Sequence, residues 1–88
     1  MVLLITYEIQ DKTRDLTKLY ATIMSAGAWW HHIGNFWLVE TLEKPEEWYK
    51  KLSPYLTNKD HIFIARIARQ YYGTLPPSAW EWLKNRNF

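Results

Sequence analysis

The chain has 88 residues, of which 48% are hydrophobic and 17% aromatic, so one folded domain spanning residues 1–88 is expected and a disordered chain is excluded. The net charge is only +2, from 11 basic and 9 acidic residues, which is too balanced for a protein that coats nucleic acid by charge alone. The absence of Cys excludes disulfides and thiolate metal sites.

The sequence contains no apolar run long enough to span a membrane, and no basic segment followed by an apolar one opens it. A cytoplasmic protein without membrane contact is therefore expected. Six Trp and six Tyr are difficult to hide inside so small a core. This aromatic content indicates a surface that contacts a partner or a ligand.

The first predicted elements are a strand, Val2–Ile9, and a helix. Side chains alternate between the two faces of a strand, and both faces of Val2–Ile9 are nearly apolar, as in a central strand. The helix is expected to be capped by Asp11 or Thr13 and to reach Ala26, because apolar residues recur there at helical spacing. These residues are Leu16, Leu19, Tyr20, Ile23 and Met24. Gly27 stands where a helix-ending glycine is typical.

The stretch from Ala28 to Thr41, AWWHHIGNFWLVET, predicts a hairpin. Its strands are Ala28–His32 and Phe36–Thr41, joined by a turn at Ile33-Gly34-Asn35, where Gly and Asn tolerate a left-handed backbone. Alternation places Trp29 and Trp30 on opposite faces. Both faces are apolar, so we expect each of them to be covered.

The second half of the chain predicts a helix and a fourth strand. The residues KPEE at 44–47 indicate a helix start, and Pro54 should end that helix near Ser53. A turn at 57–60 then leads into a strand, His61–Ala68.

Arg69–Leu75 either extends this last strand or forms a short separate one. The residues PPS at 76–78 then predict a break and the start of a short helix, Ala79–Arg86. The C-terminal tail is thus expected to be a strand or a short helix.

The predicted order is β-α-β-β-α-β with a C-terminal tail, which is the α+β pattern of the ferredoxin-like fold. Two amphipathic helices cover one face of such a sheet and leave the other face open. The open face either stacks on a second copy in a homodimer or forms an aromatic platform for RNA bases. Its aliphatic content and the absence of an RNP-like run favour the homodimer, with Trp29, Trp30 and Trp37 at the interface.

The whole chain then resembles a known family. LLITYEI, a helix, GAWWHHIGNFWLVET, a second helix and KDHIFIARI follow one another over residues 2–83. This order is similar to that of the small CRISPR-associated adaptation and endoribonuclease proteins and their SinR-like and virulence-associated-protein-D-like relatives. SinR-like sequences look most similar, because WWHH-type aromatics recur in them. The resemblance implies a ferredoxin-like homodimer with stacked sheets, in which the tail strand can pair with the partner subunit.

The resemblance also implies a candidate nuclease site at Glu8. In nuclease members of the family, an Asp after the Tyr of the first strand lies near the dimer axis, and Tyr7-Glu8 match that position here. Two Glu8 carboxylates, with Asp11 as the nearest helper, would hold Mg²⁺ or Mn²⁺ and activate a water. The competing interpretation is that Glu8 is a solvated acid and that Asp11 caps the helix.

Two other groups of residues are candidates for function. His31 and His32 would serve in acid–base catalysis beside Glu8, although adjacent strand residues point to opposite faces and cannot share one ion. Alternatively, each histidine is lodged among aromatic side chains. Arg66 and Arg69, close to Tyr71 and Tyr72, would contact phosphates and bases, the alternative being a solvated charged surface.

The function expected from these observations is a non-catalytic homodimeric module that binds nucleic acid or a protein partner in defence or mobile-element biology. No cofactor is expected for it. One alternative is a metal-dependent endoribonuclease or nuclease acting at the dimer axis. The other is a small-molecule or nucleotide-binding regulatory protein with an aromatic pocket.

Overall fold

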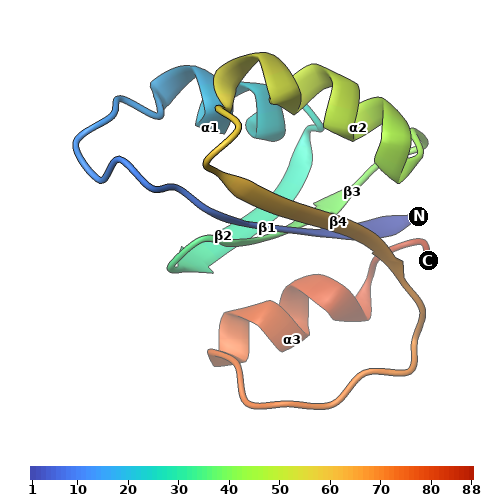
Figure 1. The fold of residues 1–88 in the computed structure, drawn as a ribbon. Helices are drawn as coiled ribbons and strands as arrows, with labels where there is room; N and C mark the ends of the chain where they lie inside the picture. The colour runs from blue at the N-terminus through green and yellow to red at the C-terminus, as the bar shows by residue number, and fades with distance from the viewer.

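Four antiparallel strands form one sheet in the order β2-β3-β1-β4 in the computed structural model, which describes residues 1–88 (Figure 1). The fold is α+β and ferredoxin-like, as expected, with one further helix after the last strand. The elements in chain order are β1 (Val2–Glu8), α1 (Thr17–Met24), β2 (Ala28–Ile33), β3 (Phe36–Glu40), α2 (Pro45–Leu52), a 3₁₀ turn (Ser53–Tyr55), β4 (His61–Ile67) and α3 (Pro77–Lys84).

The first strand, β1, occupies the centre of the sheet. It pairs antiparallel with β3 on one side and with β4 on the other, so that Val2 lies opposite both Glu40 and Ile67. Residues on both faces of β1 are buried, among them Val2 on one face and Leu3 on the other. The apolar character of both faces is therefore explained by a central position, as predicted.

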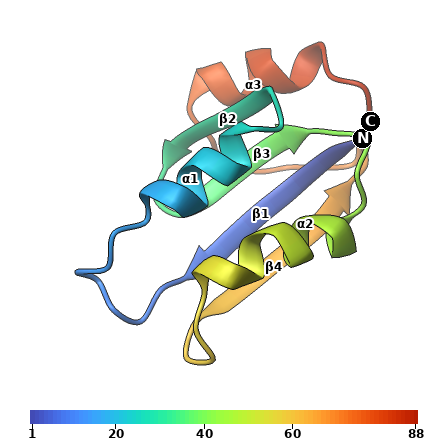
Figure 2. The same ribbon diagram turned by 90° about the horizontal axis from the view of Figure 1, so that it is seen from above.

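Helices α1 and α2 cover one face of the sheet (Figure 2). Trp37 is fully buried at the centre of this layer, and its indole Nε1 donates a hydrogen bond to the Tyr7 hydroxyl at 3.0 Å. Burial raises the pKa of Tyr7 to about 12. The buried residues of this core are Leu3, Ile5, Tyr7, Ile9, Leu19, Ile23, Trp37, Val39, Trp48 and Leu52.

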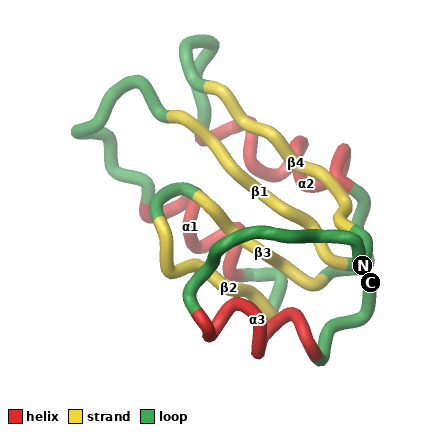
Figure 3. Tube along the Cα trace, turned by 90° about the horizontal axis from the view of Figure 1, so that it is seen from below, coloured by secondary structure: helices red, strands yellow, loops and turns green.

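Helix α3 packs on the second face of the sheet, so the expectation that no helix covers this face was wrong (Figures 1 and 3). Ala79 and Leu83 are one helical turn apart and are buried against Val2, Trp30 and Leu38. The indole Nε1 of Trp30 donates a hydrogen bond to Ser78 Oγ at 3.0 Å. A helix of only eight residues closes a second, smaller core in this way.

The connection between β4 and α3 has no regular structure. Residues Arg69–Leu75 neither extend β4 nor form a strand, so the alternative of a tail strand was wrong and the tail is a short helix. Figure 3 shows this connection crossing the second face of the sheet before α3 begins. The path explains the missing strand, because a segment that crosses over the sheet cannot also pair along its edge. None of the helices is long and apolar enough to cross a membrane.

Helix α1 begins later and ends earlier than expected. Asp11 accepts hydrogen bonds from Thr13 inside the preceding loop, so neither residue caps the helix. The N-cap position is Leu16, which makes no side-chain capping hydrogen bond, and Asp15 just before it accepts a hydrogen bond from the Thr17 backbone N–H at 2.9 Å. After Met24 the chain turns through Gly27, whose φ of 92° confirms a left-handed glycine at the helix end.

The hairpin turn contains only Gly34 and Asn35, because β2 continues to Ile33. Gly34 has a φ of 37°, as expected for a residue in a tight reversal. The Asn35 side chain donates a hydrogen bond to the backbone carbonyl of Tyr7 and ties the turn to β1. The irregular register between Trp30 and Ile33 shows that the turn end of this hairpin is bulged.

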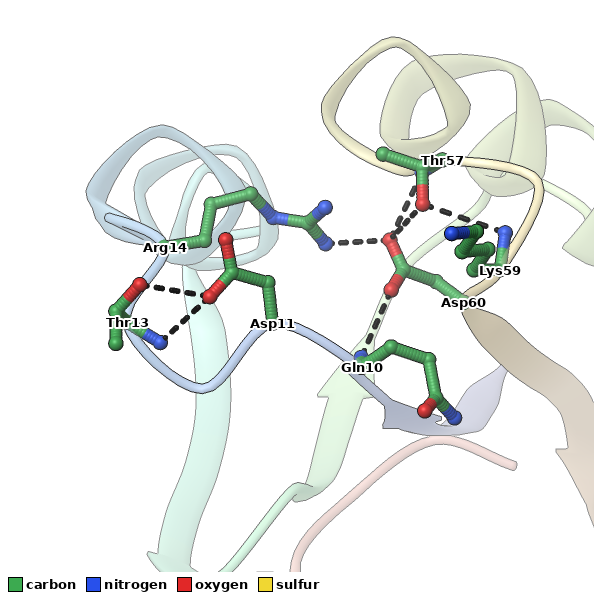
Figure 4. A network of polar contacts seen from close by, with 7 residues as sticks. All are labelled: Gln10, Asp11, Thr13, Arg14, Thr57, Lys59 and Asp60. Carbon is green, nitrogen blue, oxygen red and sulfur yellow. Dashed lines mark hydrogen bonds and ion pairs between the residues drawn. The ribbon is translucent and has the colours of Figure 1, made fainter.

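Asp60 joins two loops at the end where β1 leaves the sheet and β4 enters it (Figure 4). Its carboxylate accepts hydrogen bonds from the backbone N–H groups of Gln10 at 3.0 Å and Thr57 at 2.8 Å. The Arg14 guanidinium forms an ion pair with the same carboxylate, whose side chain is shielded from solvent. These bonds hold the long loop after β1 against the start of β4.

Candidate nucleic-acid interface

The proposed nuclease residues do not form a cluster. Glu8 is exposed at the end of β1, where it accepts a hydrogen bond from the Gln10 side chain at 3.3 Å and lies opposite His61 of β4. Hydrogen bonds from Thr13 lower the pKa of Asp11 and occupy one of its oxygens. Nowhere does the structure bring together three or more His, Asp or Glu side chains that could hold a metal ion.

His31 and His32 lie on opposite faces of β2, as alternation predicts. The His31 ring stacks on Trp37, with 3.8 Å between ring centroids and 1° between the planes, and its Nδ1 lies 2.8 Å from the Phe36 carbonyl oxygen. His32 makes an edge contact with Trp30 at 5.2 Å. His31 is therefore lodged among aromatic side chains, whereas His32 is exposed and contacts the edge of Trp30. The histidine opposite Glu8 is His61.

The three tryptophans expected at a dimer interface are packed within the chain. Trp37 is buried beneath α1 and α2, and half-buried Trp29 packs against it with 5.5 Å between ring centroids. Trp30 is only 3% exposed because α3 covers it. None of the three offers a large free surface, so any partner that contacts the sheet must use other residues.

Three of the four predicted nucleic-acid-binding residues, by contrast, contact a single residue, Phe88. Arg66 donates a hydrogen bond to the Phe88 carbonyl oxygen at 2.6 Å, and the guanidinium carbon of Arg69 lies 4.3 Å from the centre of the Phe88 ring. Tyr71 stacks on the same ring at 5.9 Å and on Trp80 at 6.1 Å. We call residues 66–72 the arginine–tyrosine segment.

Neither Arg66 nor Arg69 forms an ion pair with an acidic side chain. The three ion pairs of the structure are Arg14–Asp60, Lys51–Glu43 and Arg86–Glu40. Arg66 instead donates to a main-chain oxygen of Phe88, the last residue of the sequence, and Arg69 donates to the backbone carbonyl of Arg86. The neutral Arg86 carbonyl orients the Arg69 guanidinium and leaves its charge available to an anion, for which the guanidinium fork is well shaped.

The aromatic side chains of this segment are accessible. Tyr72 is fully exposed, and Tyr71 presents about two fifths of its surface to solvent. Phe88 and Trp80 hold Tyr71 in place by stacking on its ring, and the sequence analysis did not predict a role for either residue. The sequence signal that could have indicated them is the recurrence of aromatic residues through the last nine positions, at Trp80, Trp82 and Phe88.

No family model, curated protein or solved structure matches this chain.

Proposed function

We propose that the protein is a non-catalytic homodimeric module that binds single-stranded nucleic acid through the arginine–tyrosine segment. The observation that carries the proposal is the presence of two arginines without an acidic side-chain partner, Arg66 and Arg69, beside accessible Tyr71 and Tyr72. The resemblance to SinR-like relatives of the CRISPR-associated adaptation proteins supports a place in defence or mobile-element biology.

Each part of the segment has a separate role in this proposal. Arg66 and Arg69 contact phosphates, which gives affinity without sequence preference. Exposed Tyr72 stacks on a base, and stacking requires a base that is not already held in a duplex. Single strands should therefore bind more tightly than duplexes of the same length.

The size of the basic site limits its affinity. Two phosphate contacts on a single strand predict that log Kd rises with log salt concentration with a slope of about 1.4 per subunit. Affinity should thus be modest and strongly salt-dependent, in agreement with the small net charge of the chain.

Fluorescence anisotropy with labelled RNA and DNA strands of about 12 nucleotides tests the proposal. Tyr72→Ala should weaken binding roughly 5-fold to 100-fold, because it removes a fully exposed stacking ring. Tyr49→Ala is the matched control, since Tyr49 is an exposed tyrosine on α2 and should leave Kd unchanged. Arg66→Gln should lower the salt slope, whereas Lys50→Gln should not.

Two results would contradict nucleic-acid binding. One is the absence of binding by any strand at low salt. The other is an equal loss of affinity in Tyr72→Ala and Tyr49→Ala, which would show unspecific adsorption. Binding of a protein partner through the same segment would then be the function to pursue.

The nuclease alternative predicts that Glu8 binds a divalent metal, whereas the proposed function predicts that it does not. Two Glu8 carboxylates across a dimer axis would provide only part of the near-octahedral oxygen shell that Mg²⁺ requires, and the residue opposite Glu8 in β4 is His61 and not a further carboxylate. We expect no saturable Mg²⁺ or Mn²⁺ binding by calorimetry and no cleavage of RNA or DNA. Metal-dependent cleavage that disappears in Glu8→Ala would establish the nuclease instead.

A further inference from the structure

A cavity of about 320 Å³ lies between the second face of the sheet and the C-terminal part of the chain. Leu4, Leu38 and Ile67 come from three neighbouring strands and form its floor. Trp80 and Leu83 of α3 form one wall, and residues 71–75 of the connection before α3 form another. Figure 3 shows the connection and α3 lying over the same face of the sheet.

The lining of the cavity is almost entirely apolar. Nine of its eleven lining residues are hydrophobic, and no Asp, Glu, Lys, Arg or His is among them. Four of the hydrophobic residues are aromatic, namely Phe36, Tyr71, Tyr72 and Trp80. A charged or strongly polar ligand would lose its hydration here without finding partners for its charges.

The volume narrows the choice of ligand further. An apolar cavity of about 150 Å³ is sufficient to bind benzene and stays free of water. A cavity of about twice that volume therefore accommodates two fused rings. Its size also falls at the lower end of the range of natural small-molecule sites, which are typically concave and lined by apolar and aromatic groups.

We infer that this cavity is a binding site for a neutral bicyclic aromatic small molecule, inserted between the sheet floor and the Trp80 wall. The site is separate from the arginine–tyrosine surface in its chemistry, because it recognises apolar rings and not phosphate. It shares Tyr71 and Tyr72 with that surface. The inference does not depend on nucleic-acid binding.

An unstacked nucleobase is the obvious competing occupant, and the lining argues against it. The polar edge of a base needs several donors and acceptors, whereas the polar groups of the lining residues are limited to the Thr74 hydroxyl, the tyrosine hydroxyls, the Trp80 indole N–H and backbone such as that of Gly73. Adenosine is therefore expected to be rejected by the same cavity that accepts an uncharged ring system of similar breadth.

Titration of the full chain with indole, followed by ¹³C-methyl NMR, tests the inference. We expect saturable shifts of the methyl groups of Leu4, Leu38 and Ile67, with a dissociation constant between about 10 μM and 1 mM for so small a ligand. Adenosine at the same concentrations should leave these methyl groups unmoved. Absence of saturation with indole, or shifts spread over the whole surface, would overturn the inference.

Cavity-filling variants provide the second test. Leu4→Phe and Ile67→Phe place a ring in the cavity from two half-buried floor positions, and each should weaken indole binding at least tenfold. Ile33→Phe adds the same ring at the exposed end of β2 and should bind indole like the unaltered chain. Unchanged indole affinity in a filled variant that melts normally would contradict the inference. If one filled variant does not fold, the other decides.

Discussion

Asp60 is the residue whose ionisation most directly affects stability. Backbone hydrogen bonds from Thr57 and Gln10, followed by the Arg14 guanidinium, hold the pKa of Asp60 far below its usual range. Folding therefore favours the ionised carboxylate. This stabilisation is complete above the pKa that Asp60 has in the unfolded chain, about 4, and it is lost as pH falls below that value.

Asp60→Asn should lower the Tm at pH 7 by roughly 5 to 15 °C, because it removes an anion that two backbone N–H groups and Arg14 all contact. The Tm of the unaltered chain should fall between pH 5 and pH 3, and that of Asp60→Asn should fall less. Circular dichroism melts across this range measure both effects. Glu46→Gln, a change at an exposed acid in the first turn of α2, serves as the control. Parallel pH profiles for the Asp60→Asn and unaltered chains would refute the role of Asp60.

At the scale of elements, α3 determines how far the second sheet face is closed. It is only eight residues long and would be marginal as an isolated helix, so its stability must come from packing. Ala79 and Leu83 provide that packing, and the Trp30 indole adds a hydrogen bond to Ser78. The sheet also gains from this contact, because α3 shields Trp30 from water.

Leu83→Ala should reduce the free energy of unfolding by about 2–4 kcal/mol, the range found for buried leucines that leave a cavity. Urea denaturation followed by tryptophan fluorescence measures the loss. Lys84→Ala changes the adjacent exposed residue of the same helix and should cost less than about 0.5 kcal/mol. Equal stabilities of the two variants would mean that α3 is not docked on the sheet.

The strands and the first two helices were predictable because the apolar residues of each element recur at the spacing of a strand or a helix. For α3 the same spacing predicts a helix but not its position in the fold. The residues PPS and the pair Ala79 and Leu83 predict a short helix, but a short apolar stripe does not reveal which surface it covers. The start of α1 was misjudged for a related reason. Asp11, Thr13 and Asp15 can each form local hydrogen bonds with the backbone, and only the three-dimensional path of the loop determines that Asp15 is the one bonded to the first residue of α1.

At the scale of the whole molecule, the second face of the sheet is covered unevenly. Figure 3 shows α3 beside β2, at the far side of the sheet from β4. On β4, Phe63 remains 62% exposed, with Thr6 as its partner in β1 and the Glu8–His61 pair two residues further along the strands. This uncovered part of the sheet, with Phe63 as its large apolar side chain, is where a homodimer of the proposed kind would form.

Phe63→Asp should therefore shift the proposed dimer to a monomer. Light scattering after size exclusion at micromolar concentration should give about twice the chain mass of 10.7 kDa for the unaltered protein and the single mass for the variant. Tyr49→Asp, which alters an exposed aromatic residue of α2, is the matched control and should remain dimeric. A mass of 10.7 kDa for the unaltered chain would exclude the dimer.

The candidate site was predictable only in its exposed residues. Arg66, Arg69, Tyr71 and Tyr72 are close together in sequence, so their proximity required no knowledge of the fold. Phe88, on which three of them converge, is brought to them by the reversal of the chain through α3. The prediction that the three tryptophans lie at a dimer interface was wrong for the same reason. A sequence shows that a face is apolar without showing whether the chain itself or a partner covers it.

The central position of β1 also governs the order in which this chain can assemble. Val2 finds its neighbours only at Glu40 and Ile67, so the first strand to leave the ribosome is among the last to be enclosed. Both edges of β1 are unpaired until β3 has been synthesised, and the edge that pairs with β4 remains open to other chains until β4 follows. Pairings between distant parts of a sequence also slow folding relative to a helical bundle of equal length. Early aggregation of truncated chains that end before β4 is the hazard that this topology carries.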